Sequence, residues 1–292
     1  VGPAGAVGEV GPAGEIGPAG AAGADGLLNL SNTAIIDTEN GYDIATAQYG
    51  GKPYNSLYDA ISDASSNINN STIWILPGKH IIDTTINIPD YVTIRGISKQ
   101  NVILQMSSSV TNNMFVMGEH SSLSDLTLIM NQISPYVDAN FCCIEFPGKT
   151  TYTSTLDNCI VKLQNSDASG AITNVTGILF SGTRDASNSF PLVENISNTN
   201  INIISTGNGE KRGILLTNNN HAIVKNSNIH ISYPYTNDVS GSYVGVETNS
   251  IDISGNGSVQ IRGTNITSPI TFNSFGFSAS DILQTTPYTI NN

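Results

Sequence analysis

Two aspartates are candidates for chemistry in this sequence. Hydrolysis of a glycosidic bond needs a pair of carboxyl groups about 5 to 10 Å apart. Asp125 and Asp157 lie in segments of a repeat that begin 33 residues apart, so stacked turns of the chain would bring them close together. The same repeat gives Asp125 a structural role at a corner. The pair is therefore a candidate only, and no catalytic residue is assigned.

The histidines and cysteines do not follow the spacing of a known metal or nucleophile site. The four histidines are scattered: His80, His120, His221 and His230. The three cysteines lie close together but match no zinc pattern: Cys142, Cys143 and Cys159. Buried free thiols are the simpler interpretation. We expect no bound metal and no cofactor.

Aromatic side chains in the variable inserts could contact a ligand. Function tends to lie in such inserts, and three tyrosines beside prolines could stack on sugar rings. These candidate glycan contacts are Tyr136, Tyr233 and Tyr235.

The elements that would position these residues begin with an unbroken glycine period in residues 1–26. Only glycine fits at the axis where three polyproline II chains wind together, so this period predicts a collagen triple helix about 80 Å long. We therefore expect a parallel homotrimer. The glycines at its axis would be Gly2, Gly5, Gly8, Gly11, Gly14, Gly17, Gly20, Gly23 and Gly26.

The charge and composition exclude some partners. The chain has 292 residues and a formal charge of −12, with 11 basic against 23 acidic residues. Nucleic acids and anionic membranes attract basic surfaces, so neither is expected as a partner. No run of 18 apolar residues exists, so no membrane insertion is expected. The abundance of Asn, Ser, Thr, Ile and Gly favours strands and tight turns.

After the stalk, the chain is divided into a neck, 27–53, and a head, 54–292. A helix is expected at about 56–66, because Ser56 can cap it and Leu57, Ile61 and Ala64 share one face. Short apolar strands follow, in W-I-L-P-G-K-H and I-N-I-P-D-Y-V-T-I-R-G. This order resembles the opening coils of the pectin-lyase-like superfamily. The resemblance implies an all-β head, a right-handed parallel β-helix whose first coil the short helix caps.

Five segments of the head repeat one pattern. They begin at Leu123, Leu156, Ile196, Val224 and Ile261, which are 33, 40, 28 and 37 residues apart. Positions four, six and eight should point inward. Position three should turn a corner in a left-handed conformation, which Asn and Gly adopt readily. These corner residues are expected to stack as a structural ladder: Asp125, Asn158, Asn198, Asn226 and Gly263.

The resemblance does not extend to catalytic motifs. The N-T-D, D-D, G-H-G and R-I-K motifs of polygalacturonase-like members are missing. A collagen-like stalk with a β-helix head resembles viral fibres, tail spikes and the collagen-like proteins of giant viruses. We therefore expect a non-enzymatic structural and adhesive fibre, extracellular or on a virion surface, that attaches to a host receptor or surface glycan. One alternative is a polysaccharide-degrading spike, a glycosidase or lyase with a site between subunits. Another is a bacterial collagen-like surface or spore protein.

Overall fold

A computed structural model gives the fold of the chain. The structure describes residues 1–9, 11, 31–66, 70–107, 113–132, 139–147, 153–165, 173–181, 194–205, 209–217, 221–232, 243–249, 258–262, 264–267, 270–275 and 282–284.

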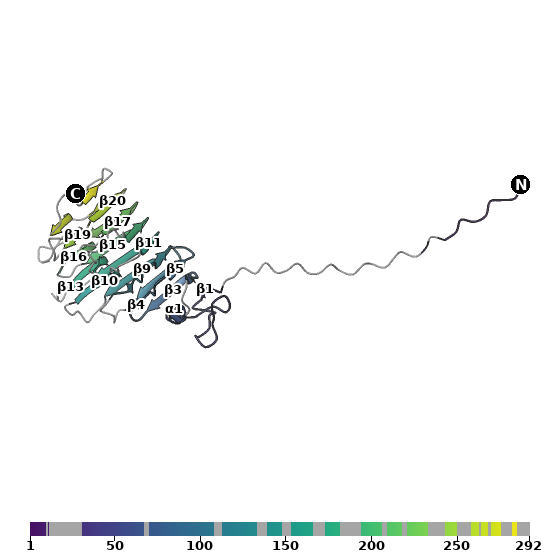
Figure 1. Ribbon diagram of the computed structural model, residues 1–292, viewed down its shortest axis with the longest axis horizontal. Helices are drawn as coiled ribbons and strands as arrows, with labels where there is room; N and C mark the ends of the chain where they lie inside the picture. The colour runs from purple at the N-terminus through teal and green to yellow at the C-terminus, as the bar shows by residue number, and fades with distance from the viewer. Residues whose placement is uncertain are drawn as a thin grey trace, which may run out of the picture.

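In the described residues, the head consists of three parallel sheets and one helix (Figure 1). Sheet A, with nine strands, runs in the order β1 (Thr33–Ile36), β2 (Thr72–Ile75), β5 (Thr93–Gly96), β8 (Ser122–Ser124), β11 (Thr155–Asp157), β14 (Glu194–Ser197), β17 (His221–Lys225), β20 (Ser258–Arg262) and β23 (Ile282–Gln284). Neighbours in this sheet come from successive turns of the chain, and they pair in parallel.

The other two sheets have seven described strands each. Sheet B contains β3 (Gly78–Ile82), β6 (Val102–Met106), β9 (Thr127–Gln132), β12 (Ile160–Asn165), β15 (Asn200–Ser205), β18 (Asn228–Ser232) and β21 (Asn265–Thr267). Sheet C contains β4 (Ile86–Asn87), β7 (Phe115–Val116), β10 (Ala139–Phe146), β13 (Thr173–Phe180), β16 (Lys211–Thr217), β19 (Tyr243–Asn249) and β22 (Ile270–Phe275). One coil thus contributes one strand to each sheet, and the prediction of a parallel β-helix is confirmed.

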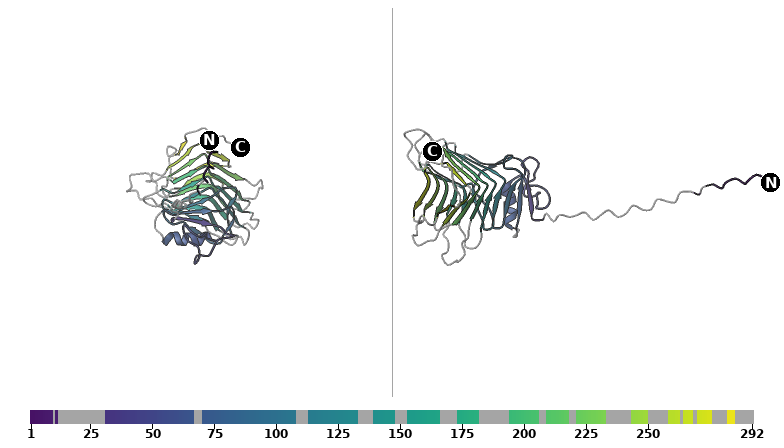
Figure 2. Two further views of the ribbon diagram at one scale, coloured as in Figure 1. Left: turned by 90° about the vertical axis from the view of Figure 1, so that its right-hand side faces the viewer. Right: turned by 90° about the horizontal axis from the view of Figure 1, so that it is seen from above.

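The N-terminal end of the stack is covered by α1 (Leu57–Ser66), as Figure 2 shows. Its apolar face is buried as the sequence predicts, with Leu57 and Ala64 each 4% exposed. The Tyr58 hydroxyl donates to the carbonyl oxygen of Thr84 at 2.9 Å and accepts from its amide at 2.8 Å. Sheet A begins earlier than the sequence suggests, because β1 lies inside the span assigned to the neck. Ala34 and Ile36 of β1 alternate into the core, so this strand belongs to the head.

The core is a set of apolar stacks along the inside of the coils. The inward positions predicted from the repeat are confirmed. Position four holds Leu126, Cys159, Thr199, Ser227 and Thr264, and position six holds Leu128, Val161, Ile201, Ile229 and Ile266, all at most 5% exposed. Parallel register explains the stacking, since Val161 pairs with Leu128 on one side and Ile201 on the other.

Two glycines in sheet C allow the coils to approach closely. A Cβ on Gly177 would lie 2.6 Å from the carbonyl oxygen of Gly213 and 2.7 Å from Cγ2 of Ile201. A Cβ on Gly213 would lie 2.4 Å from Cγ2 of Ile229. Side chains at these two positions would push sheet C away from the interior of the coil.

Candidate active site

The corner between sheets A and B brings the polar residues of several coils together. Four corner residues have a positive φ: Asp125 at 58°, Asn158 at 50°, Asn198 at 51° and Asn226 at 48°. Asn and Asp adopt this left-handed conformation more readily than most side chains. Each therefore ends a strand of sheet A and redirects the chain into sheet B. Gly263 lies outside the described residues.

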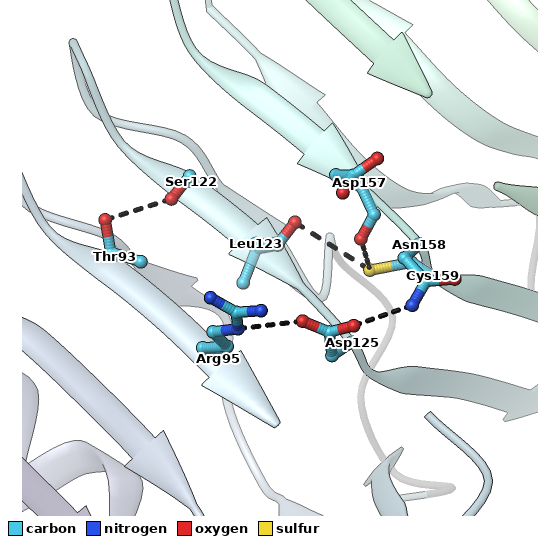
Figure 3. Close-up of polar contacts among 8 residues, drawn as sticks. All are labelled: Thr93, Arg95, Ser122, Leu123, Asp125, Asp157, Asn158 and Cys159. Atoms are coloured by element: carbon cyan, nitrogen blue, oxygen red, sulfur yellow. Dashed lines mark hydrogen bonds and ion pairs between the residues drawn. The ribbon is translucent and has the colours of Figure 1, made fainter. Parts of the chain in front are cut away.

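Asp125 lies at the centre of a polar network on the outside of this corner (Figure 3). Its Oδ2 atom is 2.9 Å from Nε of Arg95, and its Oδ1 atom accepts a hydrogen bond of 2.6 Å from Nδ2 of Asn158. The side chain of Asp125 is 18% exposed and that of Arg95 49% exposed. Arg95 also lies over the ring of Trp74, 5.1 Å from its centroid. The carboxylate is thus fixed in orientation yet reachable from solvent.

Asp157 belongs to the next coil and lies beside this network. The amide of Asp125 donates to the carbonyl oxygen of Asp157 at 3.2 Å, which fixes the two backbones against each other. Oδ1 of Asp157 accepts from Oγ of Ser197 at 2.6 Å and from Nδ2 of Asn198 at 2.8 Å. Nζ of Lys99 donates to Oδ1 of Asn158 at 2.6 Å. Two carboxylates and two basic groups therefore share one corner.

The side-chain ladder of the corner differs from the expected one. Asn158 bonds to Asp125, but Asn198 bonds to Asp157 in place of Asn158. The continuous amide ladder lies two residues later, on the outer face of sheet B. There Nδ2 of Asn228 donates to Oδ1 of Asn200 at 3.0 Å, and Nδ2 of Asn265 donates to Oδ1 of Asn228 at 3.2 Å. Asparagine at position five of the last three segments was the sequence signal for it.

A second ladder on the inside of the corner explains the small polar residues at position four. The amide of Thr199 donates to Oγ of Ser227 at 3.2 Å, and the amide of Ser227 donates to Oγ1 of Thr264 at 3.4 Å. The amide of Cys159 donates to Oγ1 of Thr199 at 3.4 Å in the same way. Each hydroxyl oxygen accepts a hydrogen bond from the amide that follows the left-handed residue of the neighbouring coil. These bonds join the backbones of successive coils at the corner.

The basic and aromatic members of the corner were not found from the sequence. Arg95 pairs in register with Ser124, and Ser124 pairs with Asp157, so all three lie in one outward row of sheet A. The alternation of buried and exposed residues in β5 and β8 could have indicated that row. The contact of Lys99 with Asn158 crosses two coils, a separation of 59 residues that no local pattern reveals.

The remaining candidates do not join this site. The three cysteines are free and buried, as expected, and burial raises the pKa of each thiol, to about 12 for Cys159. His80 is 4% exposed, and burial lowers its pKa, opposed by its contact with the Leu76 carbonyl and by Asp37. His230 is exposed on sheet B, as predicted. The candidate glycan contacts Tyr136, Tyr233 and Tyr235 lie outside the described residues.

Two features are absent from the described residues. No group of three or more His, Cys, Asp or Glu side chains among them could hold a metal ion. No helix in the described part of the chain has the length and apolar character needed to cross a membrane.

Comparison with known proteins gives a fold likeness. No protein-family model and no curated protein matches the chain. Several solved structures match it. Pectin methylesterase PemA from Erwinia chrysanthemi is 11% identical, with a TM-score of 0.46, over 87% of this chain and 92% of that one. The rice weevil enzyme is 11% identical, with a TM-score of 0.47, over 81% and 79%. The carrot enzyme is 11% identical, with a TM-score of 0.46, over 92% and 90%. The likeness concerns the parallel β-helix fold alone, which the three parallel sheets of this chain show by themselves.

This likeness corrects the main expectation about function. The sequence suggested a structural and adhesive fibre without catalytic activity, whereas these similar structures are pectin methylesterases, which are enzymes. The expectation depended on missing motifs and on the stalk. Neither can indicate which side chains the stacked coils bring together. The likeness concerns the fold and transfers no residue role to this chain.

Proposed function

We propose that the protein hydrolyses a polysaccharide at the corner between sheets A and B, with Asp125 and Asp157 as the catalytic carboxylates. One observation carries the proposal: neighbouring coils place these two carboxylates at one corner, where Asp125 pairs with Arg95 and the Asp125 amide donates to the carbonyl oxygen of Asp157. Two carboxyl groups that flank the scissile bond are the usual requirement of glycoside hydrolysis. The corner supplies both from rigid strand ends.

The environments of the two carboxylates suggest different roles. Asp125 contacts the guanidinium group of Arg95, and we assign it the role of the group that activates water or attacks the sugar. The side chains of Ser197 and Asn198, which are uncharged, both donate to Oδ1 of Asp157. Asp157 is assigned the role of the acid, which gives a proton to the leaving glycosidic oxygen, and water supplies the hydroxyl group of the second product.

The surroundings of the pair suit a sugar chain. Trp74 and Arg95 form a cation–π pair on the outer face of sheet A. Thr93 and Ser122 lie beside them on the same face, with their hydroxyl oxygens 3.0 Å apart. Hydroxyl, amide and guanidinium groups can all bond to sugar hydroxyls, which need both donors and acceptors.

Product analysis with isosteric variants tests the proposal. The wild type should release reducing ends from at least one of glucan, mannan, galactan, xylan, polygalacturonate and methyl-esterified pectin. Asp125→Asn and Asp157→Asn should each reduce this release at least about a hundredfold. Asn tolerates the left-handed corner, so Asp125→Asn should still fold. Asp83→Asn, an exposed residue that follows β3, is the matched control and should keep full activity.

Three outcomes contradict the proposal. The first is that the wild type releases no reducing ends from any of the six polysaccharides. The second is activity that survives both substitutions. The third is release of methanol from pectin without chain cleavage, which would indicate an esterase.

We also propose that residues 1–26 assemble three chains through a collagen triple helix. The unbroken glycine period supports this. Within a single chain, a Cβ on Gly8 would meet nothing within 4 Å. Any effect of Gly8→Ala must therefore arise from association between chains. The wild type should have three times the 30.7 kDa chain mass, and Gly8→Ala should melt the collagen circular-dichroism signal at lower temperature than the matched control Ala6→Ser. A monomeric wild type would exclude the triple helix.

A further inference from the structure

A pair of neighbouring aromatic rings, tilted against each other, lies at the other edge of sheet A, where chain segments from sheet C enter it. The rings of Tyr91 and His120 have centroids 4.8 Å apart and an interplanar angle of 35°. Tyr91 is 40% exposed, and His120 is also exposed. They come from neighbouring coils, directly before β5 and β8. The rings therefore form a small aromatic surface open to solvent.

The backbone at this pair is unusual for its residue types. Seven non-glycine residues in the described part of the chain have a positive φ, and five of them are Asn or Asp. The other two are Tyr91, with φ of 63°, and His120, with φ of 54°. His enters this conformation more readily than most side chains, but a bulky Tyr does so rarely and at a cost in free energy. Such strain is concentrated at functional sites.

The fold itself shows which residue suits this position. Thr72, Thr93 and Ser122 pair in register, and two residues before them lie Asn70, Tyr91 and His120. Asn70 adopts the same left-handed conformation, with φ of 47°. The position therefore accepts an asparagine in the preceding coil. Packing of the coil does not require an aromatic residue there, so the aromatic pair needs another explanation.

The two turns that carry the rings are fixed against each other. The amide of Tyr91 donates to the carbonyl oxygen of Glu119 at 2.7 Å, and the amide of Glu119 donates to Oδ1 of Asp90 at 2.7 Å. A Cβ on Gly118 would lie 2.4 Å from the carbonyl oxygen of Ile88, so the turns are in direct backbone contact. The rings are thus held in place before any ligand arrives, which reduces the entropy lost on binding.

We infer that Tyr91 and His120 form a binding subsite for a neutral sugar, at the opposite edge of the strands that carry the carboxylate corner. The choice of a sugar as ligand rests on the proposed function. Tyr91 and Arg95 flank the same short stretch of β5, so the two sites are roughly 15 Å apart. Thr93 and Ser122 lie between them with their paired hydroxyls. One extended chain could therefore contact both sites.

Stacking and charge together define the class of sugar. The face of an aromatic ring is negative and attracts the weakly positive C–H groups of a sugar face. The carboxylate of Asp90 lies beside the rings, where it accepts from the amide of Glu119, and the chain carries a net charge of −12. An acidic sugar such as a uronate would be repelled here. A neutral hexose or pentose chain fits both features.

Affinity measurements with neutral and acidic oligosaccharides test the inference. The full-length protein is titrated with hexamers of glucose, mannose, galactose and xylose, and with oligogalacturonate of the same length. At least one neutral hexamer should bind, and more tightly than oligogalacturonate. Tyr91→Asn and His120→Asn should each weaken this binding about tenfold. Tyr91→Phe keeps the ring and should bind within about twofold of wild type.

Stability of the same variants separates a ligand role from a structural one. Tyr91→Asn introduces the residue that the preceding coil uses, so its unfolding midpoint should equal or exceed that of wild type. A lower midpoint with unchanged binding would show that Tyr91 serves the fold and would overturn the inference. Equal binding of oligogalacturonate, no binding of any neutral hexamer, or loss of binding in Tyr91→Phe would overturn it as well.

The two proposals fail in different ways. Neutral-sugar binding that depends on Tyr91, without cleavage, would leave the subsite standing and remove the hydrolase. Cleavage of polygalacturonate that depends on Asp125 would leave the hydrolase standing and remove the neutral-sugar subsite. If both hold, Tyr91→Asn should raise KM with kcat almost unchanged, whereas Asp157→Asn should lower kcat.

Discussion

Substitution of Ser227 by alanine tests whether the inner hydroxyl ladder holds the corner. Ser227 is 1% exposed, and its Oγ atom accepts from the amide of Thr199 at 3.2 Å while it donates to the carbonyl oxygen of Lys225 at 2.8 Å. Alanine removes this oxygen without adding bulk. The amide of Thr199, in a residue that is 0% exposed, would then lose its acceptor.

The magnitude follows from that single group. A buried donor left without its partner costs about 1 to 3 kcal/mol, so we expect Ser227→Ala to lower the free energy of unfolding by about 2 kcal/mol. Urea unfolding, followed by circular dichroism in the β region, measures the change. Ser227→Thr restores the hydroxyl, and Thr already occupies the equivalent position in both neighbouring coils, at Thr199 and Thr264. This variant should recover most of the loss.

The matched control is an outward serine of the same stack. Ser124→Ala, on the outer face of sheet A, should change the free energy of unfolding by less than about 0.5 kcal/mol. Equal losses in Ser227→Ala and Ser124→Ala would refute the ladder argument. So would a Ser227→Thr variant that is no more stable than Ser227→Ala.

Three further predictions concern the backbone, the capped end and the close approach of the coils. Asn226→Val should cost about 1 to 2 kcal/mol because φ is 48° there, whereas Asn226→Gly should be nearly neutral; equal urea midpoints would exclude strain at the corner. Burial lowers the pKa of His80 below its ordinary 6.5, so the unfolded chain binds more protons below about pH 6.5 and the urea midpoint should fall as pH decreases from there. His80→Gln should flatten this dependence of the midpoint on pH, and the exposed His230→Gln should not. An equal dependence in both variants would show that other groups cause it. Gly213→Ala should cost about 2 kcal/mol or more, because its Cβ would lie 2.4 Å from Cγ2 of Ile229, and a midpoint like that of wild type would show that sheet C can shift.

The local sequence determined the coil and its corner. Alternation of apolar residues in segments such as Leu123–Met130 fixes which side chains face inward, because successive strand residues point to opposite faces. An Asn or Asp at position three predicts the left-handed turn, because these residues accept positive φ at low cost. Both signals lie within about eight residues of sequence, so no knowledge of neighbouring coils is needed. The repetition of these signals supported the parallel β-helix that the resemblance of the opening coils implied.

Only the tertiary structure decided which side chains meet across coils. The inserts between repeated segments vary, so the contact from Arg95 to Asp125 spans 30 residues and that from Asp157 to Asn198 spans 41. A hydrogen bond also depends on the direction of a side chain, which the corner geometry sets: Asn198 reaches Asp157, and the amide ladder runs through Asn200 and Asn228. Tyr91 and His120 carry no sequence signal, because each is an ordinary residue before a strand. They form an aromatic pair only because two coils place the same left-handed position one above the other.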